Sequence, residues 1–229
     1  MAGKLYGIGI GPGDPELLTL KAVRLIQESD VIAVPAEQKE KSVAYQIAKQ
    51  AVSGLENKPC IGILMPMTKE KEKLEESHRA ATETLVELLK QGKKVAFLTL
   101  GDPSIYSTYI YLHQRVIELG FEASLVSGIS SFCAVAARLN IGLVEKAEPL
   151  HVIPASYDIE EALKLSGTKV LMKAGKKIKE VKKQLLASDC EAVMIENCGM
   201  ENEKIYSSVE EIPEDAGYYS LIIVKEKKK

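Results

Sequence analysis

Four glycines alternate with other residues near the start of the chain, where residues 7–14 read Gly-Ile-Gly-Ile-Gly-Pro-Gly-Asp. Residues 4–10 have the apolar character of a short buried strand, which then becomes a loop almost without side chains. Leu18, Ala22 and Leu25 follow with the spacing of one helical face. Glycine lets a backbone approach a ligand or another strand closely. The order of strand, bare loop and helix therefore predicts a ligand site in an α/β protein.

Strands and helices alternate through the first two thirds of the chain. Strands are expected at 5–10, 31–34, 60–63, 95–100 and 123–126, and helices at 17–28, 42–51, 75–90, 105–119 and 131–138. This alternation predicts a mostly parallel sheet with helices on both faces. After residue 144 the strands are closer together, at 151–154, 169–173, 192–196, 203–207 and 220–224, with helices only at 159–165 and 178–187.

The change in spacing predicts two α/β domains, 1–144 and 145–229. The last two expected strands have no helix between them, so the second domain should contain a mixed sheet that ends in an antiparallel pair. A chain of 229 residues is long enough for two domains of this size.

Charge, hydropathy and cysteine usage exclude several classes of protein. A formal charge of −2 does not indicate a nucleic-acid partner, because such proteins are usually basic. No apolar run approaches the about 20 residues that span a bilayer, and the first residues lead directly into a strand rather than into a signal peptide. The four cysteines form no CxxC pair and the three histidines are far apart, so no protein-bound metal is expected. We expect a cytoplasmic protein.

The glycine loop departs from the known phosphate-binding motifs. Its alternate spacing is not G-x-G-x-x-G, and no Gly-Lys-Ser/Thr follows it. Pro12 also removes an amide that a phosphate cradle would use. The simplest alternative to a ligand site is a tight turn in which Asp14 caps the next helix.

Two more loops follow predicted strands of the same sheet. Residues 99–104 read Thr-Leu-Gly-Asp-Pro-Ser, and residues 127–132 read Ser-Gly-Ile-Ser-Ser-Phe. Because ligands bind at the carboxyl ends of strands in open α/β sheets, these loops and the glycine loop should face a shared cleft. The alternative for 127–132 is an ordinary serine helix cap. The lysine-rich segment 170–177 could neutralise an acidic substrate, or could be a solvated loop.

Together these segments resemble the tetrapyrrole methyltransferase family over nearly the whole chain. Its signatures match at 9–14, Gly-x-Gly-Pro-Gly-Asp, at 101–103, Gly-Asp-Pro, and at 128–131, Gly-Ile-Ser-Ser, in the same order and spacing. Residues 101–115, 171–173 and 218–224 look most like the precorrin-2 C(20)-methyltransferase branch. The uroporphyrinogen methylases instead favour a glycine-rich stretch after Gly-Asp-Pro, where this chain has Ser-Ile-Tyr-Ser-Thr-Tyr.

The resemblance implies a class III methyltransferase that uses S-adenosylmethionine in a cleft between two α/β domains and works as a homodimer. It would methylate carbon 20 of precorrin-2 or cobalt-factor II in cobalamin biosynthesis. The N-terminal domain would lie on the tetrapyrrole side and the C-terminal domain on the donor side. The implied contacts of the methyl donor are Pro12, Leu100, Gly101, Asp102, Ser130, Ser131, Met172, Cys198 and Ser220. The tetrapyrrole would lie against Gly11, Gly13 and Asp14, and its carboxylates against Arg138, Lys173 and Lys176.

Asp14 is the candidate catalytic residue. Methyl transfer is a direct displacement that depends mainly on positioning. The acceptor carbon then loses a proton, which Asp14 or a substrate propionate could receive. Asp14→Asn should therefore slow turnover in a methylation assay without abolishing donor binding, and normal turnover would leave Asp14 as only a cap.

Other functions are compatible with parts of the pattern. A methyltransferase of the same fold could act on uroporphyrinogen III, ribosomal RNA or a protein. The alternatives from other functional classes are a non-catalytic nucleotide-binding module and a structural α/β subunit. Calorimetry with ATP and with S-adenosylhomocysteine separates these classes, and Pro12 disfavours the nucleotide module.

Overall fold

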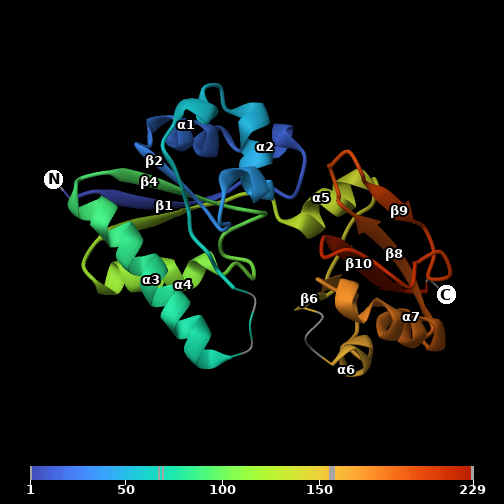
Figure 1. Cartoon of the computed structure of the whole chain (residues 1–229). Coiled ribbons are helices and arrows are strands. Elements are labelled where there is room, and N and C mark those ends of the chain that lie inside the picture. Colours follow the sequence, from blue (N-terminus) through green and yellow to red (C-terminus); the bar gives the residue numbers. More distant parts are fainter. Residues whose placement is uncertain (1, 67, 69, 155–157, 228–229) are drawn as a thin grey trace. The chain divides into compact units, whose positions relative to one another are not determined.

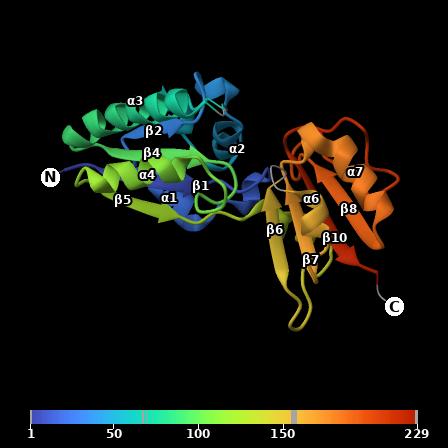
Figure 2. The same cartoon turned by 90° about the horizontal axis from the view of Figure 1, so that it is seen from below.

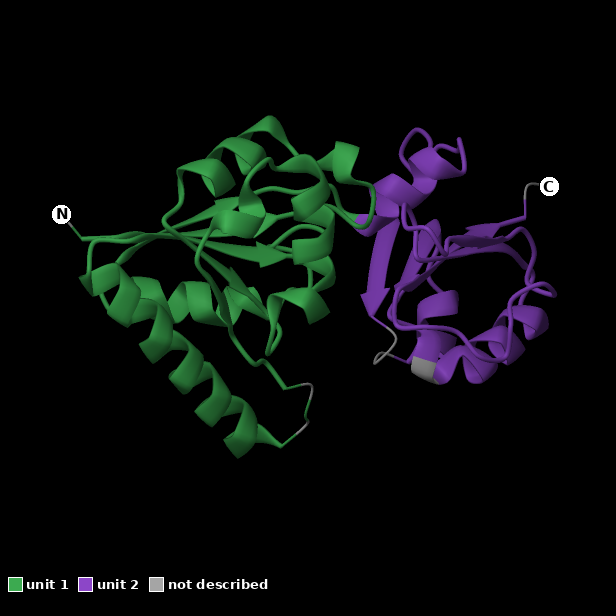
Figure 3. Ribbon diagram, turned by 45° about the horizontal axis from the view of Figure 1, so that its top comes forward, with its two compact units in different colours: residues 1–130 green, residues 131–229 purple. Residues whose placement is uncertain are grey.

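The computed structural model describes residues 2–66, 68, 70–154 and 158–227 (Figure 1). The chain divides into two compact units, Met1–Ser130 and Ser131–Lys229 (Figure 3). Among the described residues, no helix is both long and apolar enough to cross a bilayer.

Unit 1 is built on a parallel five-stranded sheet with the order β3-β2-β4-β1-β5. Its strands are β1 (Lys4–Gly9), β2 (Val31–Val34), β3 (Cys60–Gly62), β4 (Lys94–Thr99) and β5 (Glu122–Val126). The five predicted strands and their parallel arrangement are confirmed. Gly9 is in register with Thr99, so β1 and β4 end at the same edge of the sheet, and β5 lies on the other side of β1.

Helices cover both faces of this sheet, α1 (Leu20–Glu28) and α2 (Val43–Ala51) on one, α3 (Lys71–Lys90) and α4 (Tyr109–Glu118) on the other (Figure 1). The second pair packs Leu85, Leu89 and Leu112 against strand residues that include Leu5 and Phe97. Short 3-10 turns occur at Pro15–Leu17, Lys39–Lys41 and Leu55–Asn57.

Three predicted helix starts were wrong. The helix expected from residue 75 begins earlier, at Lys71. The helix expected from residue 17 is a 3-10 turn, Pro15–Leu17, followed by α1, because the Thr19 hydroxyl accepts from Ala22 N at 3.2 Å and caps a new start. The helix expected from residue 105 begins at Tyr109, because Tyr106 has a φ of +48°, a left-handed conformation that an α-helix cannot contain.

The contact between α3 and α4 contains a buried histidine. The ring of His78 stacks on Tyr111 with centroids 5.1 Å apart, beside a bidentate ion pair in which Arg115 donates to both oxygens of Glu75 at 2.6 Å. Burial and the Arg115 charge hold the pKa of His78 below its ordinary value of 6.5. The unfolded chain therefore binds a proton here more tightly than the folded one does.

The stability that neutral His78 contributes is thus complete above pH 6.5 and is lost as the pH falls below that value. We expect the free energy of unfolding to decrease from pH 7 to pH 5. His78→Phe should make this decrease smaller, with the remainder due partly to His113, whose pKa burial also lowers. Urea denaturation at several pH values measures both, and an unchanged slope in His78→Phe would contradict the assignment.

Unit 2 contains a mixed five-stranded sheet with the order β6-β7-β10-β8-β9. Its strands are β6 (Leu150–Pro154), β7 (Thr168–Met172), β8 (Cys190–Glu196), β9 (Lys204–Tyr206) and β10 (Ser220–Glu226). In the part of unit 2 that the structure describes, β6 and β7 pair in parallel and the other neighbouring strands pair antiparallel. In Figure 2, β10 lies between β7 and β8.

Helices cover both faces of this second sheet in the part of the chain that the structure describes. Helix α5 (Ser131–Arg138) lies on one face, where Val135 packs with Val170, Ile195 and Leu221. Helices α6 (Ile159–Leu163) and α7 (Ile178–Ala187) contribute Ile159 and Val181 to the core of the other face, among other residues.

Two features of unit 2 differ from the sequence-based prediction. The last two strands, β9 and β10, do not pair with each other; they flank β8, and each is antiparallel to it. The chain divides before α5, whereas the sequence placed the division near residue 145. The physical reason is the packing of Val135 into the core of the second sheet.

Candidate active site

Three loops meet at the carboxyl edge of the sheet in unit 1. Gly101 N donates to Gly11 O at 2.9 Å, and Gly11 N donates to Gly101 O at 3.2 Å, so the loops after β1 and β4 form a reciprocal pair. The loop after β5 joins them through Gly128. The prediction that the two bare loops lie at one sheet edge is confirmed, and adjacent parallel strands are the reason.

Glycines in these loops serve backbone packing. A Cβ on Gly9 would lie 2.6 Å from both Gly101 O and Gly128 N. A Cβ on Gly128 would collide with Gly101 O and lie 2.7 Å from Gly9 C. Gly101 differs, because its φ is +71° and no atom of the described chain lies within 4 Å of its Cβ position. Gly9 and Gly128 are thus needed for the contact between loops, and Gly101 for a left-handed turn.

Asp102 joins two of these loops through its carboxylate. One oxygen, Oδ2, accepts from Gly128 N at 3.0 Å. The other, Oδ1, accepts from the backbone N of Ser104 at 2.8 Å and from its hydroxyl at 2.5 Å. The sequence predicted Asp102 only as a contact of the methyl donor, and the structure adds a role in holding two loops together. The Asp-Pro-Ser sequence indicates the turn, whereas no sequence pattern indicates the hydrogen bond to Gly128.

Asp14 lies at the end of the glycine loop, after Pro12 and Gly13, which are buried. Its Oδ1 accepts from Glu16 N at 2.8 Å and caps the turn Pro15–Leu17. The capping interpretation is confirmed for this turn. The role of Asp14 as a proton acceptor stays a prediction.

Predicted donor contacts in unit 2 gather at one edge of the mixed sheet. Strand β7 ends with Met172, which is in register with Leu221, next to Ser220 at the start of β10. Cys198 follows the end of β8, and Met172 and Cys198 pack against the same core cluster. The antiparallel course of β10 therefore brings together three residues that are distant in sequence. Their contact with a donor stays a prediction.

Ser220 has an unusual environment for a polar side chain. It is 3% exposed, and its hydroxyl has no hydrogen-bond partner within the described part of the chain. Burying a hydroxyl without a partner is unfavourable, so such an atom is a candidate for contact with a ligand. Its partner in register, Glu196, is a buried carboxylate that accepts from Tyr206 OH at 3.0 Å and Gly217 N at 2.6 Å.

The predicted basic residues lie in different surroundings. Arg138 Nε donates to Glu203 Oε1 at 2.7 Å, and Glu203 Oε2 accepts from Gly199 N at 2.8 Å, so Arg138 is linked to the loop that contains Cys198. Lys173 follows Met172 at the sheet edge. The side chain of Lys176 lies outside the described residues. Ser130 is the last residue of unit 1, and Ser131 is the first residue of α5.

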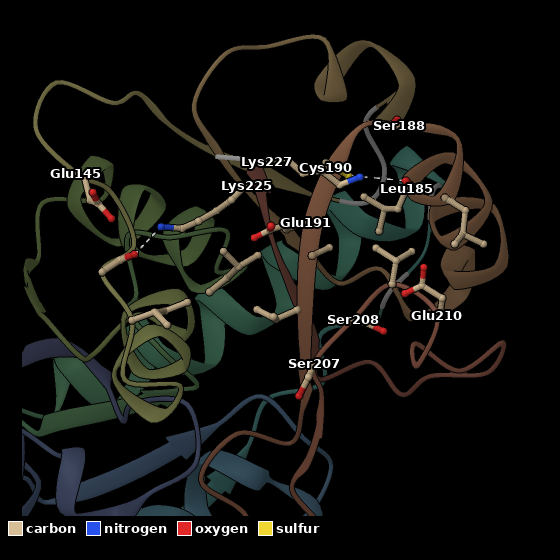
Figure 4. A pocket seen from close by; sticks show the side chains of 17 residues that line it. Glu145, Leu185, Ser188, Cys190, Glu191, Ser207, Ser208, Glu210, Lys225 and Lys227 are labelled. Atoms are coloured by element: carbon tan, nitrogen blue, oxygen red, sulfur yellow. Dashed lines mark hydrogen bonds between the residues drawn. The ribbon is translucent and has the colours of Figure 1, made fainter. Parts of the chain in front are cut away.

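Unit 2 also contains a cavity of about 620 Å³ (Figure 4). It is lined by the end of α7, the start of β8 and the end of β10, and Lys225 Nζ donates to Gly142 O at 2.7 Å beside it. These are the opposite ends of the strands from Glu196 and Ser220, and no predicted site residue with a described side chain lines the cavity. No group of three or more His, Cys, Asp or Glu in the residues described could hold a metal ion.

Comparisons with known proteins agree with this architecture. Residues 4–213 match the family model of tetrapyrrole (corrin/porphyrin) methylases. A probable cobalt-precorrin-2 C(20)-methyltransferase of Methanocaldococcus jannaschii is 38% identical and aligns over 97% of this chain and 96% of its own. A precorrin-2 C(20)-methyltransferase of Sinorhizobium sp is 30% identical over 97% and 95%. The structure of a Thermus thermophilus uroporphyrin-III C-methyltransferase complexed with S-adenosylhomocysteine superposes with a TM-score of 0.72, 22% identity and 98% coverage of both chains, which shows the same fold.

Proposed function

The chain belongs to the tetrapyrrole methylase family, and we propose that it transfers a methyl group from S-adenosylmethionine to carbon 20 of precorrin-2 or cobalt-factor II in cobalamin biosynthesis. The main support is similarity of 30–38% over nearly the full length of relatives named for this reaction on precorrin-2 or cobalt-precorrin-2. A homodimer in the cytoplasm, with no nucleic-acid or membrane partner, belongs to the same proposal.

The residues present fit a sulfonium donor with a polar nucleoside. In unit 1 we assign donor contacts to Pro12, Leu100, Gly101, Asp102 and Ser130, and in unit 2 to Ser131, Met172, Cys198 and Ser220. Three features of the described residues support this assignment: the Ser220 hydroxyl without a hydrogen-bond partner among them, the apolar packing around Met172, and the open space beside Gly101.

S-Adenosylmethionine supplies an electrophilic methyl group when bound. The protein must hold the donor in line with the acceptor carbon and exclude water, and such positioning can lower a barrier by about 7–11 kcal/mol. This requirement agrees with a site made of ordered backbone turns. Asp14 is assigned to receive the proton that the acceptor carbon loses, since a carboxylate that caps through one oxygen has a second oxygen.

The acceptor is a polycarboxylate, which basic side chains would bind by charge-assisted hydrogen bonds. We assign Lys173, Lys176 and Arg138 to this role, and Gly11, Gly13 and Asp14 to contact with the ring. Arg138 already pairs with Glu203, so its contribution would include ordering the Cys198 loop.

Methylation assays test the proposed function. Purified protein with S-adenosylmethionine should add one methyl group to precorrin-2, to cobalt-factor II, or to both, as detected by mass spectrometry. A ¹³C-labelled methyl should appear on carbon 20 by NMR. Methylation of uroporphyrinogen III alone, or ATP binding in place of S-adenosylhomocysteine binding, would overturn the proposal.

Ser220→Ala should weaken S-adenosylhomocysteine binding about fivefold to tenfold without loss of stability. The hydroxyl has no partner among the described residues, so its removal relieves a desolvation cost of about 1–3 kcal/mol in the free protein while removing a contact to S-adenosylhomocysteine. Calorimetry and thermal denaturation measure the two effects.

Ser29→Ala is the matched control. Ser29 is 2% exposed, and its hydroxyl donates to Leu25 O at 2.7 Å. This variant should lose about 1 kcal/mol of stability and keep its donor affinity. Unchanged donor affinity in Ser220→Ala would remove Ser220 from the site.

A further inference from the structure

The backbone turns sharply where β7 ends. Lys173 has a φ of +59°, a left-handed backbone conformation that residues other than glycine and asparagine rarely adopt. Asn197, directly after β8, has a φ of +52°. Both strands that flank the start of β10 therefore end in left-handed turns, next to Ser220. At this edge the Lys173 ammonium lies 5.7 Å from the centroid of the Tyr218 ring.

Tyr218 belongs to a segment that other contacts hold in place. Before it, Gly217 N donates to the buried carboxylate of Glu196 at 2.6 Å. After it, Tyr219 O accepts from Asn197 N at 3.0 Å. The Tyr218 and Tyr219 rings meet edge to face with centroids 5.3 Å apart. Tyr218 is nevertheless 44% exposed, so it is an ordered aromatic face that a ligand can reach.

We propose that Tyr218 is a positioning residue that holds the Lys173 ammonium at the Ser220 edge, where Lys173 binds a carboxylate of the tetrapyrrole. This inference rests on the proposed function. Lysine has a long flexible side chain that loses conformational freedom when it binds a carboxylate. An aromatic face attracts the ammonium and restricts it beforehand, so less freedom is lost on binding.

The binding of uroporphyrin III, a stable planar octacarboxylate, tests this arrangement through fluorescence quenching. Lys173→Met should weaken binding about tenfold, because the charge is lost while the stem remains. Tyr218→Leu should weaken it about threefold, and Tyr218→Phe less than twofold, because phenylalanine keeps the aromatic face. The double variant Lys173→Met/Tyr218→Leu should bind no more weakly than Lys173→Met alone, since Tyr218 acts through Lys173. Affinity for S-adenosylhomocysteine should stay within twofold in all of them.

A second lysine–tyrosine pair provides a matched control. In unit 1 the Lys39 ammonium lies 5.6 Å from the centroid of the Tyr45 ring, and Lys39→Met should leave the affinity for uroporphyrin III unchanged. Three results would overturn the inference. They are additive losses of uroporphyrin III affinity in the double variant, an affinity of Tyr218→Phe as low as that of Tyr218→Leu, and an unchanged affinity in Lys173→Met. Absence of uroporphyrin III binding by the wild type would also count against it.

The same variants separate failure of this inference from failure of the proposed function. If uroporphyrin III binding depends on Lys173 and Tyr218 but precorrin-2 is not methylated, only the proposed reaction is wrong. If precorrin-2 is methylated with a KM that is the same in Lys173→Met and wild type, only the inference is wrong.

Discussion

Gly128→Ala is expected to lower the free energy of unfolding by about 3 kcal/mol and to abolish measurable binding of S-adenosylhomocysteine. The added methyl would collide with Gly101 O and lie within 2.8 Å of the Cα of Gly9. These neighbours are backbone atoms of two ordered loops, so no side-chain rotation can relieve the clash. The loops would have to separate, and with them the proposed donor contacts in unit 1.

Gly54→Ala is the control for this prediction. Gly54 has a φ of +76°, and none of the residues that the structure describes has an atom within 4 Å of its Cβ position. Its substitution should cost only about 1 kcal/mol of conformational strain and leave donor binding intact. Urea denaturation and calorimetry measure both variants. A loss in Gly128→Ala no greater than that in Gly54→Ala would show that loop contact does not require glycine at 128.

Asp102→Asn is expected to lower the free energy of unfolding by about 2 kcal/mol and donor affinity by about tenfold. The carboxylate accepts hydrogen bonds at both oxygens, from Ser104 at one and from Gly128 N at the other. An asparagine amide has a single acceptor oxygen, so either Ser104 N or Gly128 N must lose its hydrogen-bond acceptor. The loops after β4 and β5 would then be joined less firmly.

Ser104→Ala separates the role of the carboxylate from that of the hydroxyl. Ser104 is exposed, so water can replace its hydroxyl bond to Asp102, and the expected loss is below about 0.5 kcal/mol. Unfolding is measured without S-adenosylmethionine or S-adenosylhomocysteine, so a residue that only contacts the methyl donor has no effect on it. An unchanged free energy of unfolding in Asp102→Asn would show that Asp102 does not hold the loops together.

Much of the geometry of the candidate site follows from local sequence patterns. Alternating apolar segments and amphipathic helices predicted the parallel sheet of unit 1. The loops after β1 and β4 were predicted to lie at one edge of this sheet, and Gly11 and Gly101 pair there. The helix starts expected at residues 17 and 105 were wrong, because the Thr19 cap and the left-handed backbone of Tyr106 set boundaries that apolar periodicity does not contain. The start expected at residue 75 was also wrong, because the helix extends over the mostly charged residues 71–74.

The sequence by itself determined the α/β class, the strands of both sheets and the turns that glycine, proline and aspartate require, because these depend on neighbours within a few residues. Only the tertiary structure decided that α5 packs with the second sheet and that β10 enters between β7 and β8. It also decided that the Ser220 hydroxyl is buried without a hydrogen-bond partner among the residues described. It alone brought Lys173 to Tyr218. The physical reason is that strand order and long-range side-chain contacts depend on which apolar faces bury each other, and residues far apart along the chain decide that together.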